Sequence, residues 1–145
     1  MARVDKALDA FKQDFSCSQA VLLAFIDDTS MDREAALKVA APFGGGVSRT
    51  GCECGAVLGA IMVIGLKYGM TIPGDADAKQ RTREKTQGLI RRFRERWGSV
   101  DCRDLLGLDL TDPKQAEYMK EHKIEHERCP KYVQSAVEIL EEIME

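Results

Sequence analysis

A chain of 145 residues with 44% hydrophobic residues can bury the core of one domain, so we expect residues 1–145 to form a single domain. The 21 basic and 24 acidic side chains nearly cancel, and a net charge of −3 argues against binding to nucleic acid or to an anionic membrane surface. The N-terminal residues lack the continuous apolar stretch of a secretory signal, which favours a cytoplasmic location. Five cysteines, an odd number, argue against a structural disulfide framework there.

Apolar residues at helical spacing, together with caps and breakers, predict helices in the first part of the chain. Ser16 is the expected N-cap of the second helix, and Pro42 ends the third. The expected elements are helices over residues 4–14, 16–27 and 33–41, followed by a glycine-rich loop over 43–51.

The most hydrophobic stretch, residues 54–66, carries no charged side chain and is apolar on all sides. Such a pattern predicts a helix that is buried all round. Only 13 residues separate Glu53 from Lys67, fewer than the roughly 20 that cross a bilayer, so we expect no membrane span.

The second half of the chain is also predicted to be helical. The basic stretch 75–97 has Leu89, Phe93 and Trp97 at intervals of four, which indicates an amphipathic helix with a solvated face. A short turn at 105–106, a helix over 113–125 and a last helix from Pro130 should follow. Since no stretch shows a sustained strand alternation, the predicted fold is an all-α bundle of six to eight helices around a central helix, 54–66.

Four of the five cysteines are predicted to lie at helix starts: Cys17, Cys54, Cys102 and Cys129. Cys129 is placed at an N-cap because Pro130 favours the first helical position. Unpaired N–H groups and about half a positive charge at a helix N-terminus favour a thiolate and lower the pKa of a thiol from about 8.5. This placement indicates thiolate chemistry, because a core cysteine has no reason to prefer a helix start.

Three further features of the sequence bear on the chemistry. Cys52-Glu53-Cys54 is the only local cysteine pair, and it leaves open a Cys-x-Cys disulfide or two metal ligands. His122 and His126 have metal-ligand spacing, but their charged neighbours indicate a solvated face, so neither is included in the site. Arg49 beside a helix N-terminus could hold a small anion or support a thiolate.

Five segments together resemble a known family: residues 15–21, 43–46, 54–60, 101–107 and 129–130. Over nearly its whole length the chain is similar to the C_GCAxxG_C_C family. The resemblance implies a small redox-active protein with four characteristic cysteines, one of them in a Cys-Gly-Ala-x-x-Gly motif. Those four positions match Cys17, Cys54, Cys102 and Cys129, whereas Cys52 is an addition to the pattern.

We therefore expect a cysteine-based redox protein, a thiol oxidoreductase if it is an enzyme. Its four cysteines should converge in one pocket, with Cys54 as the nucleophile and Cys52, Cys17, Cys102 or Cys129 as the resolving thiol. The alternative is that Cys17, Cys54, Cys102 and Cys129 hold an iron–sulfur cluster or a zinc ion, since thiolate ligation suits both. The redox partner is not identified by the sequence, and a homo-oligomer is left open.

Overall fold

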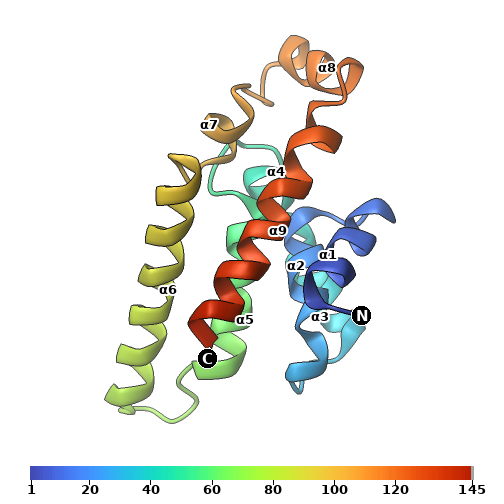
Figure 1. Cartoon of the computed structure of the whole chain (residues 1–145). Coiled ribbons are helices and arrows are strands. Elements are labelled where there is room, and N and C mark those ends of the chain that lie inside the picture. The colour runs from blue at the N-terminus through green and yellow to red at the C-terminus, as the bar shows by residue number, and fades with distance from the viewer. Residues whose placement is uncertain (145) are drawn as a thin grey trace.

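The computed structural model describes residues 1–144 and consists of helices joined by turns (Figure 1). The helices are α1 (Arg3–Lys12), α2 (Cys17–Ala24), α3 (Arg33–Ala40), α5 (Gly55–Tyr68), α6 (Ala76–Trp97), α7 (Cys102–Leu106), α8 (Pro113–Glu121) and α9 (Ile124–Met144). Shorter turns are η1 (Ile26–Asp28), η2 (Ala41–Phe43) and α4 (Gly44–Val47). Among residues 1–144 the only extended pairing is a single antiparallel bridge between Glu53 and Asp101, so the predicted all-α class is confirmed.

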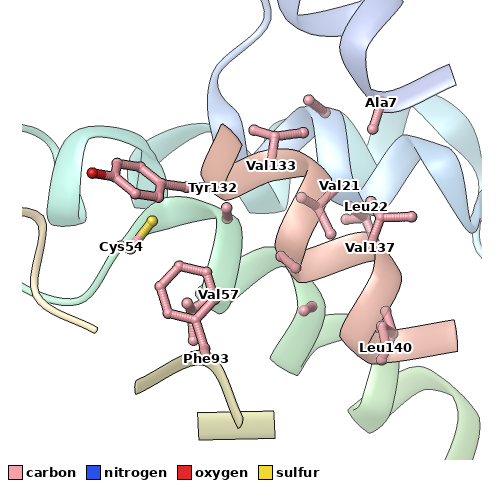
Figure 2. Close-up of a cluster of buried hydrophobic side chains, with 14 of the residues drawn as sticks. Ala7, Val21, Leu22, Cys54, Val57, Phe93, Tyr132, Val133, Val137 and Leu140 are labelled. Atoms are coloured by element: carbon pink, nitrogen blue, oxygen red, sulfur yellow. The ribbon is translucent and has the colours of Figure 1, made fainter. Parts of the chain in front are cut away.

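Three helices, α2, α5 and α9, form the centre of the molecule, and each packs against the other two. Helix α1 covers α2 and α9, α3 covers α2, and α6 lies along α5 and α9, as Figure 1 shows. Figure 2 shows core side chains from these elements meeting between the helices. Leu22, Val57, Phe93, Val137 and Leu140 are at most 1% exposed. The central position is therefore shared by three helices.

Helix α5 is the apolar helix that the sequence predicted, but its burial changes along its length. Val57, Ala60, Val63 and Ile64 are completely buried. The last turn emerges from the bundle, where Leu66 is 44% exposed. The prediction of a helix buried on every side is thus wrong for the C-terminal turn, because that turn is covered only in part, by contacts of Thr82 and Lys85 of α6 with Tyr68.

Helix α6 confirms the predicted amphipathic pattern. Leu89 and Phe93 are buried, while arginines on the outer side pair with acidic residues of α9. Arg92 lies 3.1 Å from Glu142, and Arg96 lies 3.2 Å from Glu138. Among residues 1–144, none of the helices combines the length and apolar character that crossing a membrane requires.

The last helix differs from the prediction that it starts at Pro130. Helix α9 begins at Ile124 and continues through Pro130, which lies inside it. A proline inside a helix removes one backbone hydrogen bond and costs about 3 kcal/mol or more. Tertiary contacts offset this cost: Arg128 and Tyr132 donate hydrogen bonds of 2.9 Å and 2.8 Å to carbonyl oxygens of α7. Cys129 is consequently not at a helix start.

The contact between α2 and α5 predicts opposite effects for two glycines of α5. A Cβ at Gly59 would lie 2.6 Å from the carbonyl oxygen of Ser18, which is backbone and cannot rotate away. Nothing lies within 4 Å of a Cβ at Gly65. Gly59→Ala should therefore lower the free energy of unfolding by about 1–3 kcal/mol.

The matched control is Gly65→Ala, which should raise the free energy of unfolding by roughly 0.5–1 kcal/mol because alanine favours a helix. Urea denaturation of both variants measures the difference. Equal effects of the two substitutions would show that α2 and α5 are not in close contact at Gly59.

Candidate functional site: a cavity lined by four cysteines

Four of the five cysteines line one cavity of about 380 Å³: Cys17, Cys54, Cys102 and Cys129. Cys17, Cys102 and Cys129 lie in α2, α7 and α9, Cys54 is the N-cap of α5, and all five cysteines of the chain are free thiols. The rest of the lining is mostly apolar, with Phe11, Leu105, Leu106, Leu110 and Tyr132. Figure 2 shows Cys54 beside Tyr132 at one end of the core. The cavity lies at the end of the bundle where α4, α7 and the first turns of α9 meet (Figure 1).

Cys17 reaches the cavity through close contact between the starts of α2 and α5. Ser16 is the N-cap of α2 as predicted, and it forms a capping box with Gln19 that makes Cys17 the first helical residue. The Cys17 Sγ lies directly over Gly55, where a Cβ would overlap it. Because Gly55 follows Cys54, this contact brings the two cysteines to the same wall of the cavity.

Backbone hydrogen bonds hold Cys102 beside the loop that precedes α5. The Cys52 N–H donates to the Gly46 carbonyl at 2.9 Å, and the Cys102 N–H donates to the Cys52 carbonyl at 2.7 Å. The Cys54 N–H donates to the Val100 carbonyl at 2.6 Å. These bonds fix the starts of α5 and α7 next to each other, although the two helices are far apart in the sequence.

The loop predicted for residues 43–51 contains one left-handed turn. Residues 45–49 all have φ between 54° and 70°, and the Ser48 N–H donates to the Gly44 carbonyl at 2.8 Å. Glycine adopts this conformation freely, but left-handed backbone costs about 1–2 kcal/mol at each non-glycine residue, here Val47, Ser48 and Arg49. Such strain persists where the surrounding structure imposes it, and here the turn forms part of the cavity wall.

Helix α9 supplies the opposite wall. Glu125, Cys129 and Tyr132 are spaced by four and three residues, so they lie on one face of the helix, and all three line the cavity. The Tyr132 hydroxyl donates to the Leu105 carbonyl at 2.8 Å, which ties this face to α7. Glu125 and Tyr132 were not among the predicted site residues, because their spacing to Cys129 is informative only if the helix continues through Pro130.

The cavity raises the pKa values of its thiols. Burial raises the pKa of Cys54, and the N–H groups of Val57 and Ala56 at the start of α5 oppose that rise only in part. Burial likewise raises the pKa of Cys129, and it raises that of Cys102 to about 12. The prediction that the helix start lowers the pKa of Cys54 is therefore wrong, since loss of water outweighs the helix N-terminus.

Cys17 combines partial exposure with backbone N–H groups at its sulfur. Burial raises the pKa of Cys17, but the backbone N–H groups of Gly45 and Ser18 lie at its sulfur and oppose that rise. Cys17 is also partly exposed, whereas Cys54 and Cys102 are buried. Cys129 shares the partial exposure but lies inside a helix, where no free N–H groups face it.

One ion pair lies at the edge of the cavity. The Arg49 guanidinium is 3.3 Å from the Glu125 carboxylate, and both residues also line the cavity. Behind burial and the charge of Cys17, the Glu125 charge raises the pKa of Cys102 and the Arg49 charge lowers it. Two opposite charges therefore act on the same sulfur.

The four thiols match the donor chemistry of an iron–sulfur cluster or zinc, but their arrangement does not match a metal centre. Within residues 1–144, no group of three or more His, Cys, Asp or Glu side chains is arranged to hold a metal ion. His122 and His126 are exposed and lie outside the cavity lining. A metal centre would require the sulfurs to move closer together.

Cys52 is separate from the other four. It is exposed, it does not line the cavity, and its sulfur accepts a hydrogen bond from the Thr50 hydroxyl at 3.3 Å. Only its backbone contributes to the site, through the bonds to Gly46 and Cys102. The side chains of Cys52 and Cys54 thus have different surroundings.

Comparison with known proteins yields one family and one relative of interest. The family model described as "Putative redox-active protein (C_GCAxxG_C_C)" matches residues 15–143. A protein from Archaeoglobus fulgidus, itself described as uncharacterized, is 29% identical over 143 residues, which cover 92% of this chain and 87% of the relative. No solved structure matches the chain.

The raised thiol pKa values predict a loss of stability at alkaline pH. Unfolding lets a thiol ionise near its ordinary pKa of about 8.5, whereas folded Cys102 ionises at about 12. Its contribution to the free energy of unfolding is complete below about pH 8.5 and is lost as the pH rises toward 12. Each such thiol adds a slope of up to about 1.4 kcal/mol per pH unit.

Urea denaturation of the reduced, metal-free protein between about pH 8 and about pH 10.5 tests this expectation. The free energy of unfolding should fall over this range, and it should fall less steeply in Cys102→Ala than in the wild type. Identical slopes in the two proteins would contradict the burial of Cys102.

Proposed function

Because the chain belongs to the C_GCAxxG_C_C family, we propose that its four cavity cysteines carry out thiol–disulfide exchange, which makes the protein a thiol oxidoreductase. The observation that supports this most is the gathering of four free thiols at one cavity. An apolar core can be filled without four sulfurs meeting in one place. A shared cavity allows one thiol to attack a substrate and a second to resolve the product.

In this proposal Cys17, rather than Cys54, is the attacking thiol. It is partly exposed, it starts α2, and the N–H groups of Gly45 and Ser18 lie at its sulfur. Its charge is also the largest one acting on the pKa of Cys54, Cys102 and Cys129, after burial. Cys17 thus affects the pKa of each of the other three thiols. Any of these three can act as the resolving thiol.

The reaction balances as a two-electron exchange. The Cys17 thiolate attacks one sulfur of a disulfide RSSR, the bond between its sulfurs breaks, and RS⁻ leaves. A second cavity cysteine, as thiolate, attacks the Cys17 sulfur of the mixed disulfide, and the second RS⁻ leaves. The two protein thiols are oxidised to one disulfide, RSSR is reduced, and the two protons of the protein thiols are taken up by the two RS⁻, which gives two RSH.

Raised pKa values make the resting thiols protonated at neutral pH. The reduced protein is therefore slow to react until a thiol loses its proton, and exchange should accelerate as the pH rises. The lining around the sulfurs is also mostly apolar. Both properties suit a protein that holds reduced thiols until a fitting substrate arrives.

The alternative use of the same four sulfurs is an iron–sulfur cluster or a zinc ion. The four thiols as donors favour metal binding, but among residues 1–144 the side chains are not close enough together to hold a metal ion. Metal and sulfide analysis, with a visible absorption spectrum of protein purified without oxygen, separates the two proposals. Stoichiometric iron and sulfide, or stoichiometric zinc, would show that the four cysteines bind a metal, and the proposal of thiol exchange would be wrong.

Exchange kinetics of single variants test the thiol proposal. With 2-hydroxyethyl disulfide as the substrate, Cys17→Ser should lower the rate by at least about tenfold, because the attacking sulfur is lost. At least one of Cys129→Ser, Cys102→Ser and Cys54→Ser should lower the yield of resolved product, and that variant identifies the resolving thiol. Cys52→Ser is the matched control and should react like the wild type, since Cys52 lies outside the cavity.

The opposite ranking would overturn the proposal. If Cys52→Ser abolished exchange while Cys17→Ser and Cys129→Ser had no effect, the reactive unit would be the local Cys-x-Cys pair. The cavity cysteines would then only fill space in the core.

A further inference from the structure

The cysteine cavity shares two of its lining residues, Arg49 and Glu125, with a second hollow on the surface. This second hollow, the charged groove, has a volume of about 640 Å³. It is lined by side chains of both charges, among them Arg49, Lys120, Lys123, Asp14, Glu117 and Glu125. The two hollows meet at the Arg49–Glu125 ion pair, so a molecule that spans both would place one end among charges and the other among sulfurs.

Arg49 is held at this junction by the strained left-handed turn. Its own φ is 66°, and its side-chain stem passes so close to Gly45 that a Cβ there would lie 2.9 Å from the Arg49 Cγ. A relaxed turn would point residue 49 elsewhere. The backbone is thus strained at Val47, Ser48 and Arg49. In this conformation the Arg49 guanidinium lies at the edge of the cavity.

The ion pair does not close the junction firmly. Arg49 and Glu125 are 52% and 39% exposed, and exposed ion pairs of this kind contribute little to stability. A carboxylate of an incoming molecule can replace Glu125 as the partner of Arg49, with two parallel hydrogen bonds to the guanidinium. Glu125 is then available to an ammonium group of the same molecule.

We propose that the charged groove binds the zwitterionic end of a small amino-acid or peptide disulfide, with Arg49 on its carboxylate, while the disulfide sulfur enters the cavity toward Cys17. This inference rests on the proposed thiol exchange and names its substrate class. A cavity of about 380 Å³ lies within the roughly 300–1,000 Å³ usual for small-molecule sites. Groups of both signs in the groove favour a zwitterion over a purely anionic or cationic molecule.

The chemistry is the same balanced exchange, with the substrate specified. The Cys17 thiolate forms a mixed disulfide with one half of the peptide disulfide, and the other half leaves as a thiolate that takes up the proton lost by Cys17. A second cavity thiolate releases the bound half, which takes up the second proton. Arg49 and Glu125 take no part in electron transfer; they position the substrate.

Competing substrates provide the test, with the full chain reduced beforehand. The measured quantity is the ratio of kcat/KM for glutathione disulfide, a zwitterionic peptide disulfide, to that for uncharged 2-hydroxyethyl disulfide. The wild-type ratio should be about ten or more, and Arg49→Gln should lower it about tenfold, as expected for one lost charge-assisted interaction. Arg83→Gln, on the exposed side of α6, is the control and should leave the ratio unchanged.

Binding of S-methylglutathione, which has no reactive sulfur, separates this inference from the proposed function. Saturable binding that weakens in Arg49→Gln supports the groove even if no disulfide is reduced. If S-methylglutathione does not bind, and the ratio is near one or insensitive to Arg49→Gln while exchange still occurs, the substrate class is wrong and thiol exchange stands.

Discussion

The arrangement of the cysteines depends on how closely α2 and α5 approach each other. Gly55 leaves room for the Cys17 sulfur, and Gly59 leaves room for the backbone of Ser18. Gly44 likewise lies against Ser16, where a Cβ would come within 2.5 Å of the serine Cβ. A side chain at Gly55 or Gly59 would separate the two helices and remove Cys17 from the wall that carries Cys54. The glycines are therefore required by packing before any chemistry is considered.

Two further constraints complete the cavity around this contact. The backbone bonds from Cys52 and Cys102 join the glycine loop to α7, and Tyr132 joins α7 to α9. In the loop, three non-glycine residues adopt left-handed backbone at about 1–2 kcal/mol each. That cost is a large part of the roughly 5–15 kcal/mol by which a typical domain is stable. The strained residues lie in the part of the loop that lines the cysteine cavity and carries Arg49.

Local patterns in the sequence predicted the helices well. The interval of four that joins Leu89, Phe93 and Trp97 describes α6 correctly, and Ser16 caps α2 as expected. The start of α9 was wrong because Pro130 is a strong local signal, whereas the hydrogen bonds from Arg128 and Tyr132 to α7 are tertiary. A local rule cannot register a partner more than twenty residues away.

For the candidate site, the sequence predicted which cysteines lie together, but it predicted neither the other lining residues Glu125 and Tyr132 nor the electrostatics. The cysteine pattern identified the four that line the cavity and set Cys52 apart. The direction of the Cys54 pKa was wrong, because a helix start can be inferred from the sequence and the loss of water around a sulfur cannot. The proximity of Arg49 and Glu125, 76 residues apart, also required the fold.

The most direct test of the central claim, that four cysteines act as one unit, is a peptide map of the disulfides formed in the oxidised protein. The reduced chain is oxidised with excess 2-hydroxyethyl disulfide, free thiols are alkylated, and bridged peptides are identified by mass spectrometry. We expect an intramolecular bridge from Cys17 to Cys54, Cys102 or Cys129, with no protein bridge at Cys52. A Cys52–Cys54 bridge, with Cys17, Cys102 and Cys129 still unbridged, would contradict it.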